Sequence, residues 1–241
     1  MMQAIPPGDE APKLDFREHL TPEQRRRIKR ETAYHEAGHA IATFLTVGRS
    51  HIDGIDMRGD GRTLGFLAHS RVFRTSFYSV HPLPYLRLKV MEAGIRSMMG
   101  PFAERYVTGE SWDWDTFIET IYYEADIDGS YWDGNFDFPP EWQPFTDADC
   151  LLNAVSVLPK RERWPYLRFI RKWTEEFGTH PLIKTAIERL GEMLVEVDFM
   201  EGERVSEVLA ECLGNVSCLQ KLAPAWQRRA SVASRAMWGN D

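Results

Sequence analysis

Apolar residues recur at helical spacing along most of the chain, which predicts a mainly helical protein. Two helix starts also carry capping signals. Thr21-Pro22-Glu23-Gln24 forms a capping box with proline in the first turn, and Thr146 is a natural N-cap. The segments with helical spacing are 21–47, 85–106, 146–159, 160–178, 180–194 and 205–213.

A different pattern follows the first predicted helix. Residues 51–57 alternate apolar and polar positions, as in a half-buried strand, and residues 58–61 form a turn. Residues 63–69 then predict a second strand, so the two strands form a hairpin. Residues 199–203 are interpreted as a connector. The expected fold is therefore mainly α with a small β-hairpin or sheet.

The first predicted helix contains the sequence H-E-x-x-H, with His35, Glu36 and His39. Residues four apart lie about one turn apart on the same helix face, so both imidazoles can bind one Zn²⁺. Glu36 points to the side, where it can take a proton from a metal-bound water. This spacing predicts half of a hydrolytic metal site.

The motif alone also occurs by chance, but its neighbours favour a metal site. Ala37, Gly38 and Ala40 thin the helix around the two histidines, as close packing against another element requires. Glycine inside a helix costs roughly 1 kcal/mol relative to alanine, so Gly38 is not a neutral choice.

The nine residues from Thr32 to Ala40, T-A-Y-H-E-A-G-H-A, resemble the zinc-binding helix of the FtsH-type metallopeptidases, the protease half of membrane-bound AAA+ enzymes. Other segments extend the resemblance over most of residues 21–213. They are L-G-F in the second strand, M-G-P-F-A-E-R-Y-V-T-G-E at 99–110, and the H-P and E-G-E-x-V patterns of the last two helices.

The resemblance implies several structural features. The helix that carries residues 99–110 should pack against the zinc helix, and Glu104 becomes a candidate carboxylate that orients a ligand imidazole. The alternative for Glu104 is a surface ion pair. A substrate should pair in extended form with a sheet edge near the metal. Pro101 departs from the family pattern and is expected to kink the helix or to begin a new turn.

The family resemblance also implies a third zinc ligand, an Asp in the first turn of a later helix. Asp147 and Asp149 both qualify, and Asp113 and Asp115 are outside candidates. Asp147 is four residues before Leu151 and continues the buried stripe, whereas Asp149 falls on the polar face. Asp147 is therefore the predicted ligand; the alternative is that it only complements the helix dipole.

Residues 111–145 have no counterpart in the family pattern. Between residues 110 and 149 the sequence has twelve acidic side chains, eleven aromatic ones and no Lys or Arg. The rest of the chain is then about +5, since the whole chain carries −7. Residues 126–129 resemble the start of a calcium-binding loop, but the Gly and the later acidic residues do not have the spacing of an EF-hand. The segment is interpreted as an inserted lobe that covers the active-site mouth or docks on the surface.

Composition and short motifs restrict the expected location, redox state and partners of the protein. No apolar run is long enough for a membrane span, and no signal segment begins the chain, so a soluble cytoplasmic protein is expected. Cys150, Cys212 and Cys218 are expected to be reduced. The sequence lacks a basic stripe with interleaved aromatics and a phosphate loop, so nucleic acid is not expected and any ATPase is a separate polypeptide. Three other histidines could also act as ligands, although a surface or core position is favoured for each: His51, His69 and His81.

The sequence thus predicts three parts: an arm at 1–20, a zincin-like peptidase domain at 21–215 and a tail at 216–241. The predicted function is a stand-alone zinc metallopeptidase acting on a protein or peptide. Glu36 is the predicted general base, and Zn²⁺ is bound by His35, His39 and Asp147. One alternative is a metal-binding regulatory or interaction protein that keeps the fold, with a separate ATPase or regulator as partner. A weaker alternative is a structural zinc domain.

Overall fold

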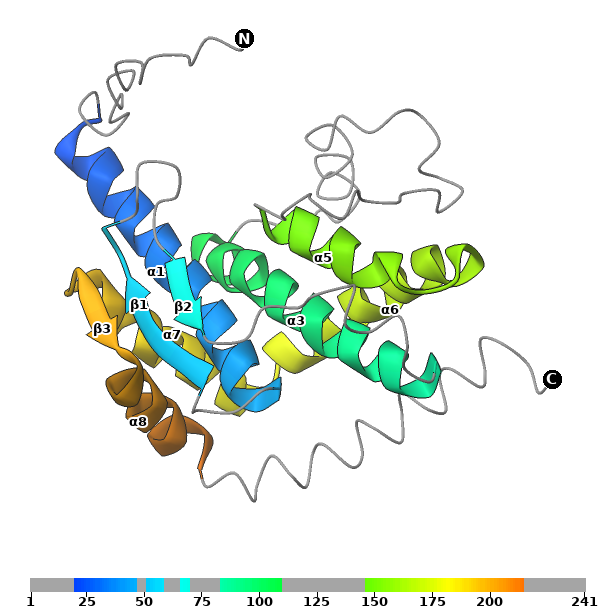
Figure 1. The fold of residues 1–241 in the computed structure, drawn as a ribbon. Helices are drawn as coiled ribbons and strands as arrows, with labels where there is room; N and C mark the ends of the chain where they lie inside the picture. Colours follow the sequence, from blue (N-terminus) through cyan, green and yellow to red (C-terminus); the bar gives the residue numbers. More distant parts are fainter. Residues whose placement is uncertain (1–19, 47–50, 59–65, 70–82, 110–145, 215–241) are drawn as a thin grey trace, which may run out of the picture.

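The computed structural model describes residues 20–46, 51–58, 66–69, 83–109 and 146–214. Within these ranges the chain forms six helices and one three-stranded sheet (Figure 1). The prediction of a mainly helical fold with a small sheet is therefore confirmed. The arm, the inserted segment and the tail that the sequence suggested lie almost entirely outside the described residues.

Helix α1 (Pro22–Thr46) carries the H-E-x-x-H motif and contributes a large part of the core. The predicted capping box begins it: the Thr21 amide donates to the Gln24 side chain at 2.8 Å, and the Gln24 amide donates to the Thr21 hydroxyl at 3.2 Å. The first two turns are exposed, whereas the helix is largely buried from Thr32 onward. The motif therefore lies in the buried half of the helix.

Helices α3 (Leu83–Thr108) and α7 (Pro181–Val195) both pack against α1. Glycines allow both contacts to be close. A Cβ on Gly38 of α1 would lie 2.1 Å from the Met99 carbonyl oxygen, and one on Gly191 would lie 2.8 Å from the Tyr34 ring. The close packing that Gly38 predicted is confirmed. Helix α3 continues through Pro101 without a break, so no new helix begins there.

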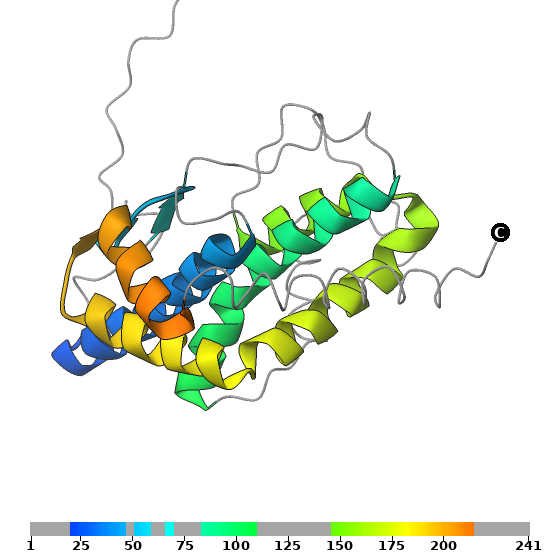
Figure 2. The ribbon, with the colours of Figure 1, turned by 90° about the horizontal axis from the view of Figure 1, so that it is seen from below.

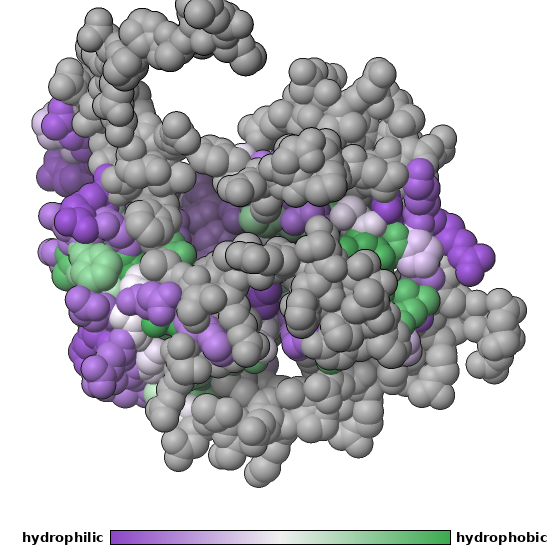
Figure 3. Space-filling view, viewed as in Figure 1, coloured by the Kyte–Doolittle hydropathy of each residue, from purple (hydrophilic) through white to green (hydrophobic). Residues whose placement is uncertain are grey.

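Helices α5 (Asp147–Ser156) and α6 (Lys160–Gly178) pack on α3, and α8 (Gly202–Leu213) packs on α7 (Figure 2). All of these helices follow the apolar spacing of the sequence. None of the described helices combines the length and apolar character that a membrane span needs. Hydrophilic residues cover much of the described surface in the view of Figure 3.

The sheet has strand order β2-β1-β3, and both pairings are antiparallel. Strands β1 (Ile52–Asp56) and β2 (Phe66–His69) pair as the sequence predicted. The interpretation of residues 199–203 as a connector was wrong. Phe199–Glu201 form β3, and α8 begins at Gly202. Only one side chain of this three-residue strand is buried, so the sequence offers too little alternation to reveal it.

Candidate metal centre

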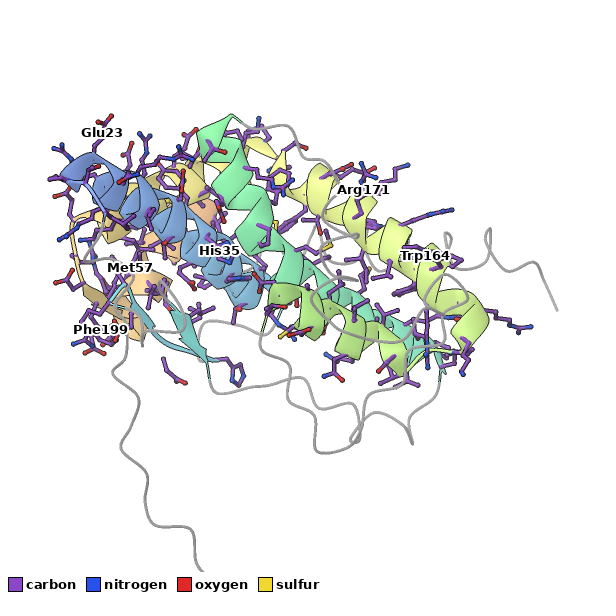
Figure 4. The ribbon with its side chains drawn as sticks, turned by 90° about the horizontal axis from the view of Figure 1, so that it is seen from above. Glu23, His35, Met57, Trp164, Arg171 and Phe199 are labelled. Carbon is purple, nitrogen blue, oxygen red and sulfur yellow. The ribbon has the colours of Figure 1, made fainter. Side chains whose placement is uncertain are left out.

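Three side chains from two helices meet where α1, α3 and α5 come together (Figure 4 labels His35). The Asp147 carboxylate lies 2.9 Å from His35 Nε2 and 3.1 Å from His39 Nε2. The two Nε2 atoms are 3.0 Å apart. Among the described residues, this is the group of His, Cys, Asp and Glu side chains close enough to hold a metal ion.

Both imidazoles are held by their other nitrogen. His35 Nδ1 lies 2.9 Å from Glu104 Oε2, and His39 Nδ1 lies 2.6 Å from the Arg96 carbonyl oxygen. A carboxylate and a carbonyl only accept hydrogen bonds, so each Nδ1 carries a proton and donates it. In the neutral imidazoles both Nε2 lone pairs then face the Asp147 carboxylate. Such a set of acceptors is complementary to a cation.

The pKa values of the three side chains agree with a site that is complementary to a cation. Burial lowers the pKa of His35, but hydrogen bonds to Asp147 and Glu104 outweigh it and raise the pKa to about 10. For His39 the effect of burial, which alone would lower the pKa, is outweighed by the negative charge of Asp147. The net result is a raised pKa. The pKa of Asp147 is held well below its usual range because the two histidines outweigh the opposing effect of burial. The centre therefore favours positive charge.

The separations of the ligand atoms also fit a small ion. A Cβ built on Gly100 of α3 would lie 2.3 Å from His39 Nε2 and 2.7 Å from His35 Nε2. With bonds of 2.0–2.1 Å, two ligands of a tetrahedral Zn²⁺ lie about 3.3 Å apart. The observed separations of 2.9 to 3.1 Å are close to this value. The residues present therefore fit a bound Zn²⁺.

Glu36 lies beside the three-residue cluster and is only 5% exposed. Burial raises the pKa of its carboxyl group above the usual value, although His39, His35 and a hydrogen bond from the Leu67 amide oppose the rise. Leu67 belongs to β2, so this carboxylate is held between the two histidines and the sheet. A carboxylate with a raised pKa in such a position is a stronger base than an ordinary carboxylate and can accept and return a proton.

Asp149, the alternative third ligand, has a different role. The Thr146 amide donates to Asp149 Oδ2 at 2.9 Å, and the Asp149 amide donates to the Thr146 hydroxyl at 3.1 Å. This capping box begins α5 and leaves Asp147 on the inward face. The structure therefore places Asp147, and not Asp149, in the cluster. Asp113 and Asp115 lie outside the described residues.

The remaining predicted residues are also accounted for. Glu104 contacts His35, as the interpretation as an orienting carboxylate required. His51 does not belong to the cluster, and the side chains of His69 and His81 lie outside the described part. Gly100 and the Arg96 carbonyl were missed, because their importance depends on how α3 crosses α1.

No model of a protein family, no curated protein and no solved structure matches this chain. The resemblance to the FtsH-type metallopeptidases is therefore carried by the sequence motifs. What it implies about activity is a proposal, which has to be supported by the site itself.

Proposed function

We propose that this protein is a zinc-dependent metallopeptidase of the zincin-like, FtsH type that hydrolyses peptide bonds. The observation that carries the proposal is the meeting of His35, His39 and Asp147 beside the buried carboxylate of Glu36. Two imidazoles and one carboxylate are a ligand set that suits Zn²⁺. Three protein ligands leave the fourth position open, as in catalytic zinc sites.

Each residue then has a defined task. His35, His39 and Asp147 hold the ion, while Glu104 and the Arg96 carbonyl fix the orientation of the two rings. Bound Zn²⁺ supplies a Lewis acid that polarises a carbonyl and lowers the pKa of water. Glu36 accepts a proton from the attacking water and delivers it to the departing amine, a task to which its raised pKa is suited.

The position of β2 supports a peptide as the substrate. In the described sheet β2 is an edge strand, and its Leu67 amide is hydrogen-bonded to Glu36. An extended peptide that pairs along a sheet edge is bound mainly by its main chain, which suits a protease with broad specificity. A peptide bound near β2 would therefore lie near the general base.

The experiment compares metal content and hydrolysis of unfolded casein in wild type and three variants. Glu36→Gln should keep one zinc per chain. Its rate of casein hydrolysis should be lower by at least about 10²–10⁴-fold, because the general base is removed. Asp147→Ala should lose the zinc, and the matched control Asp149→Ala should keep both zinc and activity. Near-normal hydrolysis by Glu36→Gln would exclude the proposed base.

The interaction-protein alternative predicts a different combination of results. Wild type would bind zinc through the same three residues but would not cleave casein or flexible peptides. A chelator would then lower thermal stability, and hydrolysis would be absent both with and without it. If zinc is absent from the wild type after saturation with the metal, both proposals fail.

A further inference from the structure

We infer that Gly100 is part of the metal centre, because the main chain of α3 at this residue forms a wall of the ion's position. A side chain at residue 100 would occupy the space that the ion requires. This inference rests on the proposed metal site and adds a residue that contributes no ligand atom.

The geometry at Gly100 distinguishes it from the other helix-packing glycines. The three atoms nearest to a Cβ at Gly100 all belong to the imidazoles of His39 and His35, and two of them are the Nε2 atoms that face Asp147. Zinc binds imidazole nitrogen at 2.0–2.1 Å, and the Cβ would lie 2.3 and 2.7 Å from these nitrogens. The Cβ would therefore crowd the two nitrogens that the ion needs as ligands.

Gly38, in contrast, is needed for the close packing of two helices. A Cβ there would lie 2.1 Å from the Met99 carbonyl oxygen and 2.6 Å from the Met99 carbonyl carbon, both in the main chain of α3. A clash with the main chain forces two helices apart. A clash with the ends of two histidine side chains can be relieved when the rings turn away, which leaves the helices in place.

Alanine at residue 100 should therefore disrupt the metal centre more than the fold. Gly100 lies inside α3, where alanine has a higher helix propensity than glycine. The rings of His35 and His39, once displaced, no longer direct both Nε2 atoms at Asp147. Changes of outer residues that only orient ligands cost about 10–100-fold in metal affinity, so displacement of the ligands themselves should cost at least about 100-fold.

Gly94→Ala is the matched control, because Gly94 lies on the same helix and is also crowded. A Cβ at Gly94 would lie 2.6 Å from Ile170 Cδ1 and 3.1 Å from Leu151 Cδ1, which are ends of apolar side chains. Both variants thus replace glycine by alanine inside α3 at a crowded position. Only one of them places the new methyl group against the metal ligands.

The first test titrates Zn²⁺ into wild type, Gly100→Ala and Gly94→Ala in competition with a chromophoric chelator. Circular dichroism and thermal unfolding of the metal-free proteins report on the fold. Gly100→Ala should keep the helical spectrum and lose at least about 100-fold in zinc affinity, whereas Gly94→Ala should stay within about 3-fold of wild type. Wild-type affinity in a folded Gly100→Ala would overturn the inference.

The second test uses the unsubstituted chain. Met99-Gly100 is the only Met-Gly pair in the sequence, so labelling with ¹³C-carbonyl methionine and ¹⁵N-glycine gives a single correlated amide signal. Stoichiometric Co²⁺ should broaden or shift this signal strongly relative to the diamagnetic Zn²⁺ form. An unchanged signal would overturn the inference, even if Gly100→Ala fails to fold.

The outcomes separate this inference from the proposed function. If wild type binds neither Zn²⁺ nor Co²⁺, the metal site and the role of Gly100 both fail. If wild type binds the metal and Gly100→Ala binds it equally well, only the role of Gly100 fails.

Discussion

An ion pair between α3 and α6 gives a stability prediction that does not depend on the metal centre. Arg87 Nε and Nη2 donate to the two carboxylate oxygens of Glu162 at 2.9 and 2.8 Å. The Glu162 side chain is 3% exposed and the Arg87 side chain 18% exposed. The hydroxyl of Tyr166 donates to the Arg87 carbonyl at 2.6 Å, a contact that replacement of the arginine side chain leaves in place.

Arg87→Met should cost about 3–5 kcal/mol, because it leaves a buried carboxylate without its charged partner. At about 2–4 °C per kcal/mol for a domain of 150–250 residues, the melting temperature should fall by roughly 6–20 °C. Glu162→Leu should cost less, since the partly exposed guanidinium of Arg87 can still reach water. The double variant Arg87→Met/Glu162→Leu should recover much of the loss, because paired hydrophobic replacements of buried ion pairs are often near neutral.

Urea unfolding at pH 7, followed by circular dichroism and tryptophan fluorescence, gives the free energies of unfolding for this cycle. The order of stability should be wild type and double variant above Glu162→Leu, with Arg87→Met lowest. If Arg87→Met costs less than about 1 kcal/mol, or if the double variant is as unstable as Arg87→Met, the stated reasoning about the buried carboxylate is refuted.

Three further predictions concern the metal centre and its surroundings. Glu104→Gln should weaken zinc binding by about 10–100-fold in a chelator competition, because the carboxylate at His35 Nδ1 is lost; wild-type affinity would contradict this. Asp149→Ala should lower the free energy of unfolding by about 1 kcal/mol through loss of the capping box and leave zinc affinity unchanged, as calorimetry and the same competition can check. Burial and the negative charges of Asp147 and Asp149 raise the pKa of the Cys150 thiol to about 12, so the thiol stays protonated at pH 8. Peptide mass spectrometry should then show slow alkylation of Cys150 in the native protein and fast alkylation in urea.

The residues that could be predicted are those whose role depends on local spacing. His35 and His39 share a helix face by periodicity alone, and the same periodicity separated Asp147 from Asp149. The helix caps at Thr21 and Thr146 could also be predicted from the sequence, because a capping box involves residues only three positions apart.

The features that were missed depend on contacts between distant segments. Gly100 matters only because α3 crosses α1 beside the histidines, and no local pattern reports that crossing. Strand β3 has only three residues, and its pairing with β1 is not visible in the sequence. The role of residues 111–145 stays a prediction, since they lie outside the described part of the chain.

The separation of the ligands along the chain has a consequence for biosynthesis. His39 and Asp147 are 108 residues apart. At a synthesis rate of about 5–20 residues per second, both histidines leave the ribosome roughly 5–20 s before the carboxylate. A nascent chain therefore carries the H-E-x-x-H helix without the third ligand. The timing keeps the proposed peptidase activity from starting before α5 has been made.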